Sequence, residues 1–134
     1  MIEARPARLD DLRTLTPMIQ PRMLAALTYQ IGASGAVTFE RGGEVLAMAG
    51  LYPDPDFAEV WFLAVPELRN MRREAVAIVR KLDLLLWALP PEWLVVCCVL
   101  QGHETGLRLV RMLGFTREIA SRHQRFRTFA LATR

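Results

Sequence analysis

The spacing between hydrophobic residues changes along this chain, and these changes divide the chain into predicted strands and helices. Runs rich in β-branched and aromatic residues, bounded by Gly, Pro or Asp, predict strands. Runs with apolar residues three or four positions apart, between charged residues, predict helices. The predicted strands are residues 2–6, 36–40, 44–52, 58–65, 93–100, 115–121 and 124–131. The predicted helices are residues 9–15, 22–30, 70–89 and 104–113.

Three of these patterns place elements relative to one another. A glycine turn at residues 41–43 separates two strands and predicts an antiparallel hairpin. The second strand of that hairpin carries an apolar run, Val45 to Leu51, which predicts a central place in a sheet. The helix over residues 70–89 joins two buried strands, so those two strands are predicted to be parallel. The expected fold is α/β (α+β), in the order βααβββαβαββ, with a mixed central sheet of about six to seven strands and helices on both faces.

Composition sets limits on size and location. The 134 residues suit one domain, so residues 1–134 are expected to fold as a unit. Apolar residues make up 52% of the chain and charged residues 23%, which favours a buried core over disorder. The first residues contain no apolar segment of the kind found in secretory signals, and Pro90-Pro91-Glu92 interrupts the longest apolar stretch. We therefore expect no membrane helix and a cytoplasmic location.

The cysteines and histidines predict no metal site. Cys97 and Cys98 are adjacent, so on a strand their side chains point to opposite faces and cannot share a metal ion. The only histidines are His103 and His123, and no cluster of other ligands surrounds either one. We expect both cysteines to belong to the core.

Three stretches of the sequence, taken with the predicted element order, resemble a known family. They are Ile2 to Leu12, Leu63-Ala64-Val65-Pro66-Glu67-Leu68-Arg69, and the late series His103, Gly106, Val110 and Gly114-Phe115. In order and spacing they resemble the first strand and helix, the fourth strand and turn, and the late motif of the GNAT superfamily of acetyl-CoA-dependent N-acetyltransferases. The resemblance covers nearly the whole chain and implies the GNAT fold.

A narrower resemblance is to the small GNAT-like proteins encoded by tailed bacteriophages. It is carried by Trp61, Pro66-Glu67-Leu68 and Gly114-Phe115. It implies a phage protein, which could be cytoplasmic or associated with the virion.

The superfamily resemblance implies acetyl-CoA as the cofactor and two segments that hold it. Leu63, Ala64 and Val65 match the strand edge whose backbone holds pantetheine. The family holds the pyrophosphate with a glycine-rich turn at a helix N-terminus, but from Arg69 onward this chain has Arg72 and Glu74 where small residues belong. Arg69, Arg72 and Arg73 could grip phosphate with their side chains instead. The alternative interpretation is an ordinary charged first turn of an exposed helix.

The same resemblance points to candidate catalytic groups. Val110 stands where many members have a tyrosine acid, and valine cannot donate a proton. Glu59 matches the carboxylate that family members place on the fourth strand facing the acceptor, although a solvent-facing Glu is the alternative. His103 is the second candidate base, with a side chain suited to proton transfer near neutral pH. A polar residue at a helix start accounts for His103 equally well.

The sequence leaves two functions open and favours neither strongly. The first is an acyl-CoA-dependent N-acetyltransferase with a degenerate pyrophosphate turn, whose partners are acetyl-CoA and an amine acceptor. The second is a non-catalytic GNAT-fold protein, phage-encoded or virion-associated, that acts through a protein partner or a homo-oligomer. A nucleic-acid role for the basic segment from Arg117 to Arg127 lacks a recognisable binding motif, so we expect none.

Overall fold

The computed structural model describes the chain apart from residues 16–20, 33–34, 54–55, 103, 122–124 and 133–134. Its strands are β1 (Glu3–Pro6), β2 (Ala36–Arg41), β3 (Glu44–Pro53), β4 (Ala58–Ala64), β5 (Val95–Leu100), β6 (Phe115–Ile119) and β7 (Phe126–Leu131). Its helices are the 3-10 helix η1 (Leu9–Asp11), α1 (Leu12–Leu15), α2 (Pro21–Gly32), the 3-10 helix η3 (Pro66–Asn70), α3 (Arg72–Trp87) and α4 (Glu104–Met112). The predicted order of elements is confirmed, with the two 3-10 helices added. Within the described residues, no helix has the length and apolar character needed to cross a membrane.

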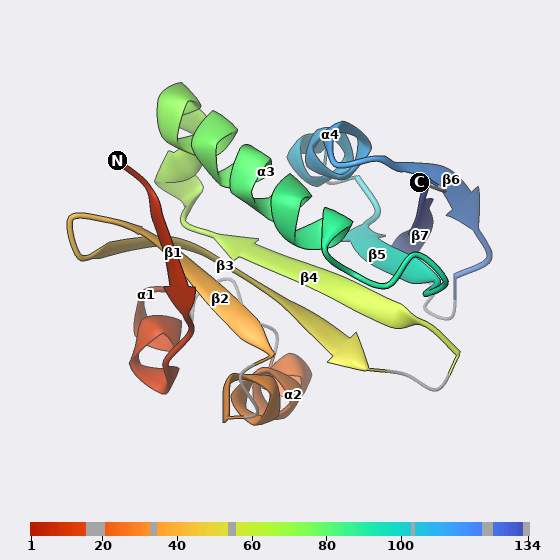
Figure 1. The fold of residues 1–134 in the computed structure, drawn as a ribbon, viewed down its shortest axis with the longest axis horizontal. Helices are drawn as coiled ribbons and strands as arrows, with labels where there is room; N and C mark the ends of the chain where they lie inside the picture. The colour runs from red at the N-terminus through yellow and green to blue at the C-terminus, as the bar shows by residue number, and fades with distance from the viewer. Residues whose placement is uncertain (16–20, 33–34, 54–55, 103, 122–124, 133–134) are drawn as a thin grey trace.

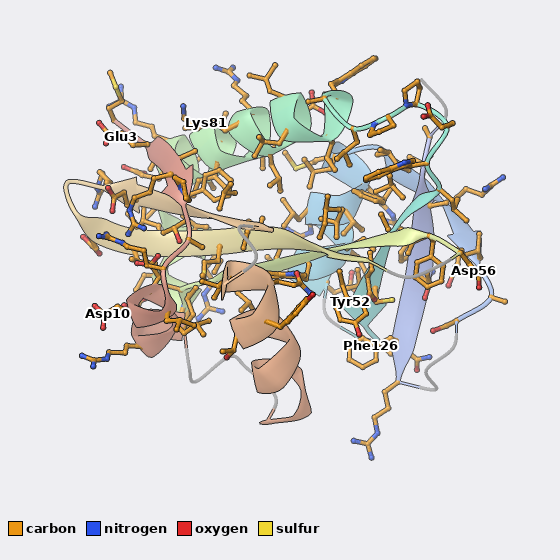
Figure 2. The ribbon with its side chains drawn as sticks, turned by 60° about the horizontal axis from the view of Figure 1, so that its bottom comes forward. Glu3, Asp10, Tyr52, Asp56, Lys81 and Phe126 are labelled. Atoms are coloured by element: carbon orange, nitrogen blue, oxygen red, sulfur yellow. The ribbon has the colours of Figure 1, made fainter. Side chains whose placement is uncertain are left out.

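The strands form one seven-stranded mixed sheet in the order β1-β2-β3-β4-β5-β7-β6 (Figure 1). Neighbouring strands are antiparallel except for β4 and β5, which are parallel and are connected through α3. The predicted crossover is therefore confirmed. The helices α3 and α4 lie on one face of the sheet, and α1 and α2 lie on the other (Figures 1 and 2).

Each face of the sheet carries its own hydrophobic cluster. On the α3 face, Ile78, Leu82 and Leu86 recur every four residues along the helix and pack against strand residues that include Phe39 and Phe129. On the α2 face, residues of the helices pack against three strand side chains; the cluster consists of Leu12, Leu15, Leu27, Ile31, Ala36, Met48 and Trp61. Full burial of each large apolar side chain contributes about 1.5–3 kcal/mol. The central strand β3 therefore has to be apolar on both sides, as the sequence predicted.

Glycines with positive φ end two of the elements. Gly42 and Gly43 have φ of 56° and 84°, and both central residues of a type I′ hairpin turn require positive φ. Gly114, with φ of 96°, lies in the turn between the end of α4 and the first residue of β6. The sequence identified all three positions correctly.

The predicted bounds differ from the structure mainly at the ends of α3 and β5. The helix predicted to start at residue 70 begins at Arg72, because the preceding residues form η3 after the extended residue Val65, with Pro66 at the first helical position. The strand predicted from residue 93 begins at Val95, after the turn that follows Pro90. The predicted start of the last strand, residue 124, lies outside the described residues.

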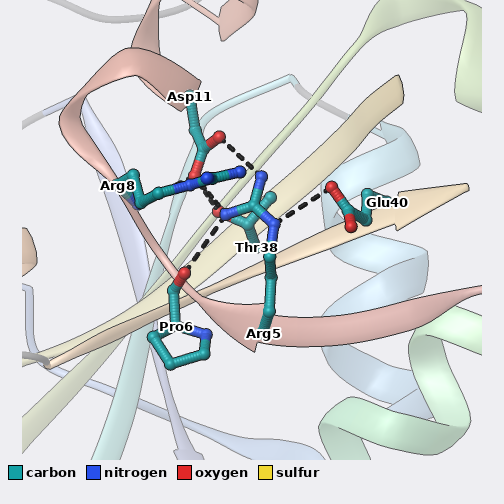
Figure 3. A network of polar contacts seen from close by, with 6 residues as sticks. All are labelled: Arg5, Pro6, Arg8, Asp11, Thr38 and Glu40. Atoms are coloured by element: carbon teal, nitrogen blue, oxygen red, sulfur yellow. Dashed lines mark hydrogen bonds and ion pairs between the residues drawn. The ribbon is translucent and has the colours of Figure 1, made fainter. Parts of the chain in front are cut away.

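A buried carboxylate joins β1, η1 and β2 (Figure 3). Asp11 is 5% exposed and accepts hydrogen bonds from both terminal nitrogens of Arg5 (2.8 and 2.9 Å), from the Arg8 backbone N–H (2.8 Å) and from Thr38 Oγ1 (2.8 Å). Arg5 Nε also donates to Glu40 at 3.0 Å. Burial alone would raise the pKa of Asp11, but these hydrogen bonds outweigh burial and lower it to about 2.

Protonation of Asp11 is expected to destabilise the fold in acid. Its pKa is about 2 in the folded protein and 3.8 ordinarily, so its stabilising contribution is complete above about pH 4 and is lost as the pH falls toward 2. The difference corresponds to about 2 kcal/mol. Urea unfolding of the wild type between pH 6 and pH 2 should show this loss, and in Asp11→Asn the loss should be smaller.

Asp11→Asn should also lower the free energy of unfolding at pH 7 by about 3 kcal/mol, because it removes one partner of a buried ion pair. Asp10→Asn is the matched control, since Asp10 lies in the same 3-10 helix and pairs with Arg13 at an exposed position. Its effect should stay below about 0.5 kcal/mol. Equal effects of the two substitutions would contradict the role given to Asp11.

Candidate functional site

The strands β4 and β5 separate part of the way along their length. Their paired residues run from Ala58 with Val95 to Val60 with Cys97. β4 continues to Ala64 and β5 continues to Leu100, yet among the described residues no further pair joins the two strands. Backbone N–H and C=O groups inside a sheet need partners, so a parting of two central strands exposes groups that a ligand can bind.

Alternation along β4 identifies which backbone groups face this gap. The Ala58 N–H donates to Leu94 O on the β5 side (2.8 Å), whereas the Val65 N–H donates to Leu46 O on the β3 side (3.0 Å). The pairing of β4 with β3 is continuous, so successive residues of β4 face β5 and β3 in turn. Phe62 therefore directs its backbone N–H and C=O groups toward the gap.

The three residues predicted to hold pantetheine are divided by this alternation. Ala64 shares the orientation of Phe62 and faces the gap, while Leu63 and Val65 direct their backbone groups toward β3. All three side chains are half-buried. The sequence prediction missed Phe62, although the two-residue period of a strand would have connected it with Ala64.

The N-terminus of α3 carries the predicted arginines. Arg69, Arg72 and Arg73 are all exposed. The first backbone hydrogen bond of the helix runs from the Ala75 N–H to Met71 O (2.9 Å), so the N–H groups of the preceding residues lie in the unpaired first turn. This end of a helix attracts anions.

A carboxylate of the chain itself already lies in that first turn. Glu74 Oε1 accepts a hydrogen bond from Arg41 Nη1 at 2.5 Å, which ties α3 to the end of β2. The pKa of Glu74 is lowered, first by a hydrogen bond from its own backbone N–H and then by Arg41. No local pattern predicts this ion pair, because its partners are 33 residues apart.

These residues have the chemistry to hold two parts of an acyl-CoA molecule, the pantetheine arm and the phosphates. The backbone edge at Phe62 and Ala64 suits the amide-containing pantetheine arm, since each residue offers one donor and one acceptor. The exposed Arg69, Arg72 and Arg73 suit phosphate by charge and by geometry. The family's glycine cradle is absent, and Glu74 lies where the pyrophosphate would approach the helix. A fit at the phosphate end therefore relies on arginine side chains rather than on backbone N–H groups.

The candidate base Glu59 lies on the face of the sheet that α2 covers. Glu59 is half-buried, and its cross-strand neighbour on β3 is Tyr52. On its other side it contacts the thiol of Cys98, which lies 3.4 Å from Thr128 Oγ1. Figure 2 shows Tyr52 and Phe126 on the same side of the sheet as α2. A carboxylate, a thiol and two hydroxyl groups thus share this face beside the parting of β4 and β5.

Neither cysteine is suited to nucleophilic chemistry at neutral pH. Burial, a hydrogen bond to Glu59 and the charge of Glu59 raise the pKa of Cys98 to about 12, despite the opposing hydrogen bond with Thr128. Burial likewise raises the pKa of Cys97 to about 12. Cys97 belongs to the core on the α3 face, as predicted, whereas Cys98 points to the opposite face.

The sequence analysis singled out two further positions, the candidate base His103 and Val110. His103 lies outside the described residues. Val110, at the tyrosine position of the family motif, is 4% exposed and belongs to the core cluster. Glu59 therefore remains the sequence-predicted catalytic residue that the structure places beside the parting of the strands.

Comparison with known proteins gives the same architecture. No protein-family model matches the chain, and no curated protein sequence matches it. Solved structures match over almost its full length. A GNAT-family acetyltransferase from Bacillus cereus is 13% identical, with a TM-score of 0.68 and coverage of 97% of this chain and 96% of that one.

Two further structures agree. An N-acetyltransferase from Staphylococcus aureus is 14% identical, with a TM-score of 0.68 over 100% of this chain and 99% of the other. A chimeric spermidine N-acetyltransferase from Vibrio cholerae is 16% identical, with a TM-score of 0.67 over 98% and 95%. Identity this low establishes the architecture and leaves the reaction to be argued from the site. The chain has the fold of the GNAT acetyltransferases.

Proposed function

We propose that this chain transfers an acyl group from acyl-CoA to an amine. The observation that carries the proposal is the parting of β4 and β5 beyond Val60 and Cys97, with the backbone of Phe62 and Ala64 directed into the gap. The structural neighbours include a spermidine N-acetyltransferase, which supports an amine as the acceptor. Acyl-CoA supplies, when bound, an acyl thioester whose carbonyl carbon an amine can attack.

Glu59 is the proposed general base. An attacking amine has to lose a proton as its nitrogen bonds to the carbonyl carbon, and the Glu59 carboxylate can accept that proton. Cys98 beside it stays protonated at neutral pH, so it donates a hydrogen bond and forms no acyl-enzyme. The acyl group is therefore transferred directly from the thioester to the amine. Val110 cannot protonate the leaving thiolate, so we assign that proton to water.

Substitution of the proposed base should separate turnover from cofactor binding. Glu59→Gln is expected to lower kcat roughly a hundredfold or more, since it removes the proton acceptor. Its affinity for acetyl-CoA should stay unchanged, because the strand edge that holds pantetheine is backbone. The measurements are thiol release with a panel of amines and calorimetric titration with acetyl-CoA. Glu3→Gln, exposed on β1, is the control and should leave both values unchanged. An undiminished kcat in Glu59→Gln would rule out this residue as the base.

The carboxylate at the start of α3 is expected to weaken cofactor binding. Glu74→Gln should raise affinity for acetyl-CoA and for 3′,5′-ADP on the order of tenfold, because a negative charge next to phosphate is removed and Arg41 is released. Glu44→Gln is the matched control. Glu44 lies 4.0 Å from the same Arg41 but in the hairpin, outside the first turn of α3. Calorimetric titration in low salt should show the gain in Glu74→Gln and no gain in the control.

A second candidate function is favoured by the same ion pair. A helix N-terminus neutralised by the chain's own Glu74, together with a buried Val110 in place of an acid, suits a GNAT-fold protein that binds partners without catalysis, as in a phage or virion-associated role. Failure of acetyl-CoA to bind at millimolar concentration, in the wild type and in Glu74→Gln alike, would establish this alternative over the enzyme. A protein partner or a homo-oligomer would then be the object of pull-down and mass measurements.

A further inference from the structure

A glutamine near the end of α2 is buried, and half of its amide has no partner in the part of the chain that the structure describes. Gln30 is 2% exposed. Its Oε1 accepts a hydrogen bond from the Trp61 indole N–H. Its Nε2 has no hydrogen-bond partner among the residues that the structure describes. Buried polar groups in native proteins are nearly always paired, so this amide nitrogen calls for an explanation.

The orientation of the Gln30 amide is fixed by chemistry. An indole nitrogen can only donate, so the atom of Gln30 that faces it has to be the oxygen. Rotation of the amide by 180° would set N–H against N–H. The Nε2 group therefore points away from Trp61 and holds two donor hydrogens ready for an acceptor.

The indole itself has little freedom to move. It lies directly on the backbone of β3 at Gly50, where a Cβ atom would come within 2.4 Å of the ring. Only glycine permits this approach. Gly50 therefore sets the position of Trp61, and Trp61 sets the direction in which Gln30 presents its donor.

The donor and the proposed base lie on the same face of the sheet. Trp61 follows Glu59 by two residues on β4, so both side chains are on the same face with Cα atoms about 7 Å apart. Gly50 likewise precedes Tyr52 by two residues on β3, and Tyr52 is paired with Glu59 across the strands. Tyr52 is 41% exposed, which gives this corner of the sheet access to solvent. The Gln30 amide, hydrogen-bonded to Trp61, thus lies over the same face of the sheet as Glu59.

We propose that Gln30 Nε2 binds an oxygen of the acceptor, so that the substrate class is an amine with a neighbouring amide carbonyl, such as an amino-acid amide or the amino terminus of a peptide. This inference rests on the proposed function and names its acceptor. A neutral donor beside the Glu59 carboxylate favours a neutral carbonyl oxygen over a carboxylate, which Glu59 would repel. A polyamine offers no oxygen and would leave the Gln30 donor unpaired.

The dimensions agree with this class of acceptor. An α-amino amide holds its amine nitrogen and its carbonyl oxygen roughly 3 Å apart. Two hydrogen bonds of about 2.9 Å extend that span to about 9 Å. Trp61 and Glu59 have Cα atoms about 7 Å apart, and Gln30 is hydrogen-bonded to the Trp61 ring, so an acceptor of this length suits the spacing inferred between Gln30 and Glu59.

The test compares three amines on the protein without acyl-CoA. L-alaninamide carries the carbonyl, 3-methyl-2-butanamine has the same shape without an oxygen, and spermidine is a polyamine. NMR titration should give a Kd for alaninamide at least about tenfold lower than for the other two, since a site built to hydrogen-bond an oxygen rejects ligands that lack one. In the wild type, alaninamide should also shift the Gln30 side-chain NH₂ resonance, assigned by its loss in Gln30→Met.

Two substitutions of Gln30 and one control test whether Gln30 causes the preference for alaninamide. Gln30→Met should remove the preference for alaninamide. Gln30→Glu keeps an acceptor for the Trp61 N–H but presents a carboxylate to the ligand, so it should reverse the preference toward spermidine. Gln101→Glu makes the same chemical change at an exposed position and should leave the preference intact.

The outcomes separate this inference from the proposed function. Equal affinities for the three amines, a preference retained in Gln30→Met, or no binding of any amine would each overturn the inference. Acetyl transfer to spermidine and alaninamide at equal kcat/KM would also overturn it while supporting the transferase. A preference for alaninamide without any acetyl transfer would support the amide site and contradict the transferase.

Discussion

The parting of β4 and β5 is the constraint on which the rest of this structure depends. Only Ala58 to Val60 and Val95 to Cys97 pair across the two strands, so this short stretch joins β1–β4 to β5–β7 within the sheet. The helix α3 spans the same junction on one face and packs the core residues Ile78, Leu82 and Leu86 there. A sheet interrupted in this way stays whole because the helix connects its two parts. The interruption also supplies the free backbone edge on which the proposed function rests.

The carboxylates of Asp11 and Glu74 have different roles in the fold. Asp11 is deeply buried, and each of its hydrogen bonds serves to join β1, η1 and β2, so its role is structural. Glu74 lies in the first turn of α3, and Arg41 holds it there. Glu74 stabilises α3 at the positive end of the helix dipole. A phosphate would bind at the same end, so the two negative groups compete for it.

The α2 face combines tight packing with unused hydrogen-bonding capacity. Gly50 admits the Trp61 ring, and the ring directs the Gln30 amide. Glu59, Cys98 and Thr128 lie farther along the same face, joined by contacts between three different strands. Such an arrangement holds donors and a carboxylate in fixed directions, which favours recognition of a small polar molecule over a purely structural role.

The sequence by itself determined the order of the elements, the crossover between β4 and β5 and the glycine turns, because periodicity and turn chemistry are local properties. Through spacing that resembles the GNAT family, the sequence also nominated Glu59 and the strand edge near Ala64 as site residues. Only the tertiary structure decided which backbone groups face the gap, that Arg41 pairs with Glu74, and that Gln30 meets Trp61. Those contacts join residues 31 to 33 positions apart. Local pattern carries no information about such pairs, since their geometry arises when the sheet twists and the helices pack on it.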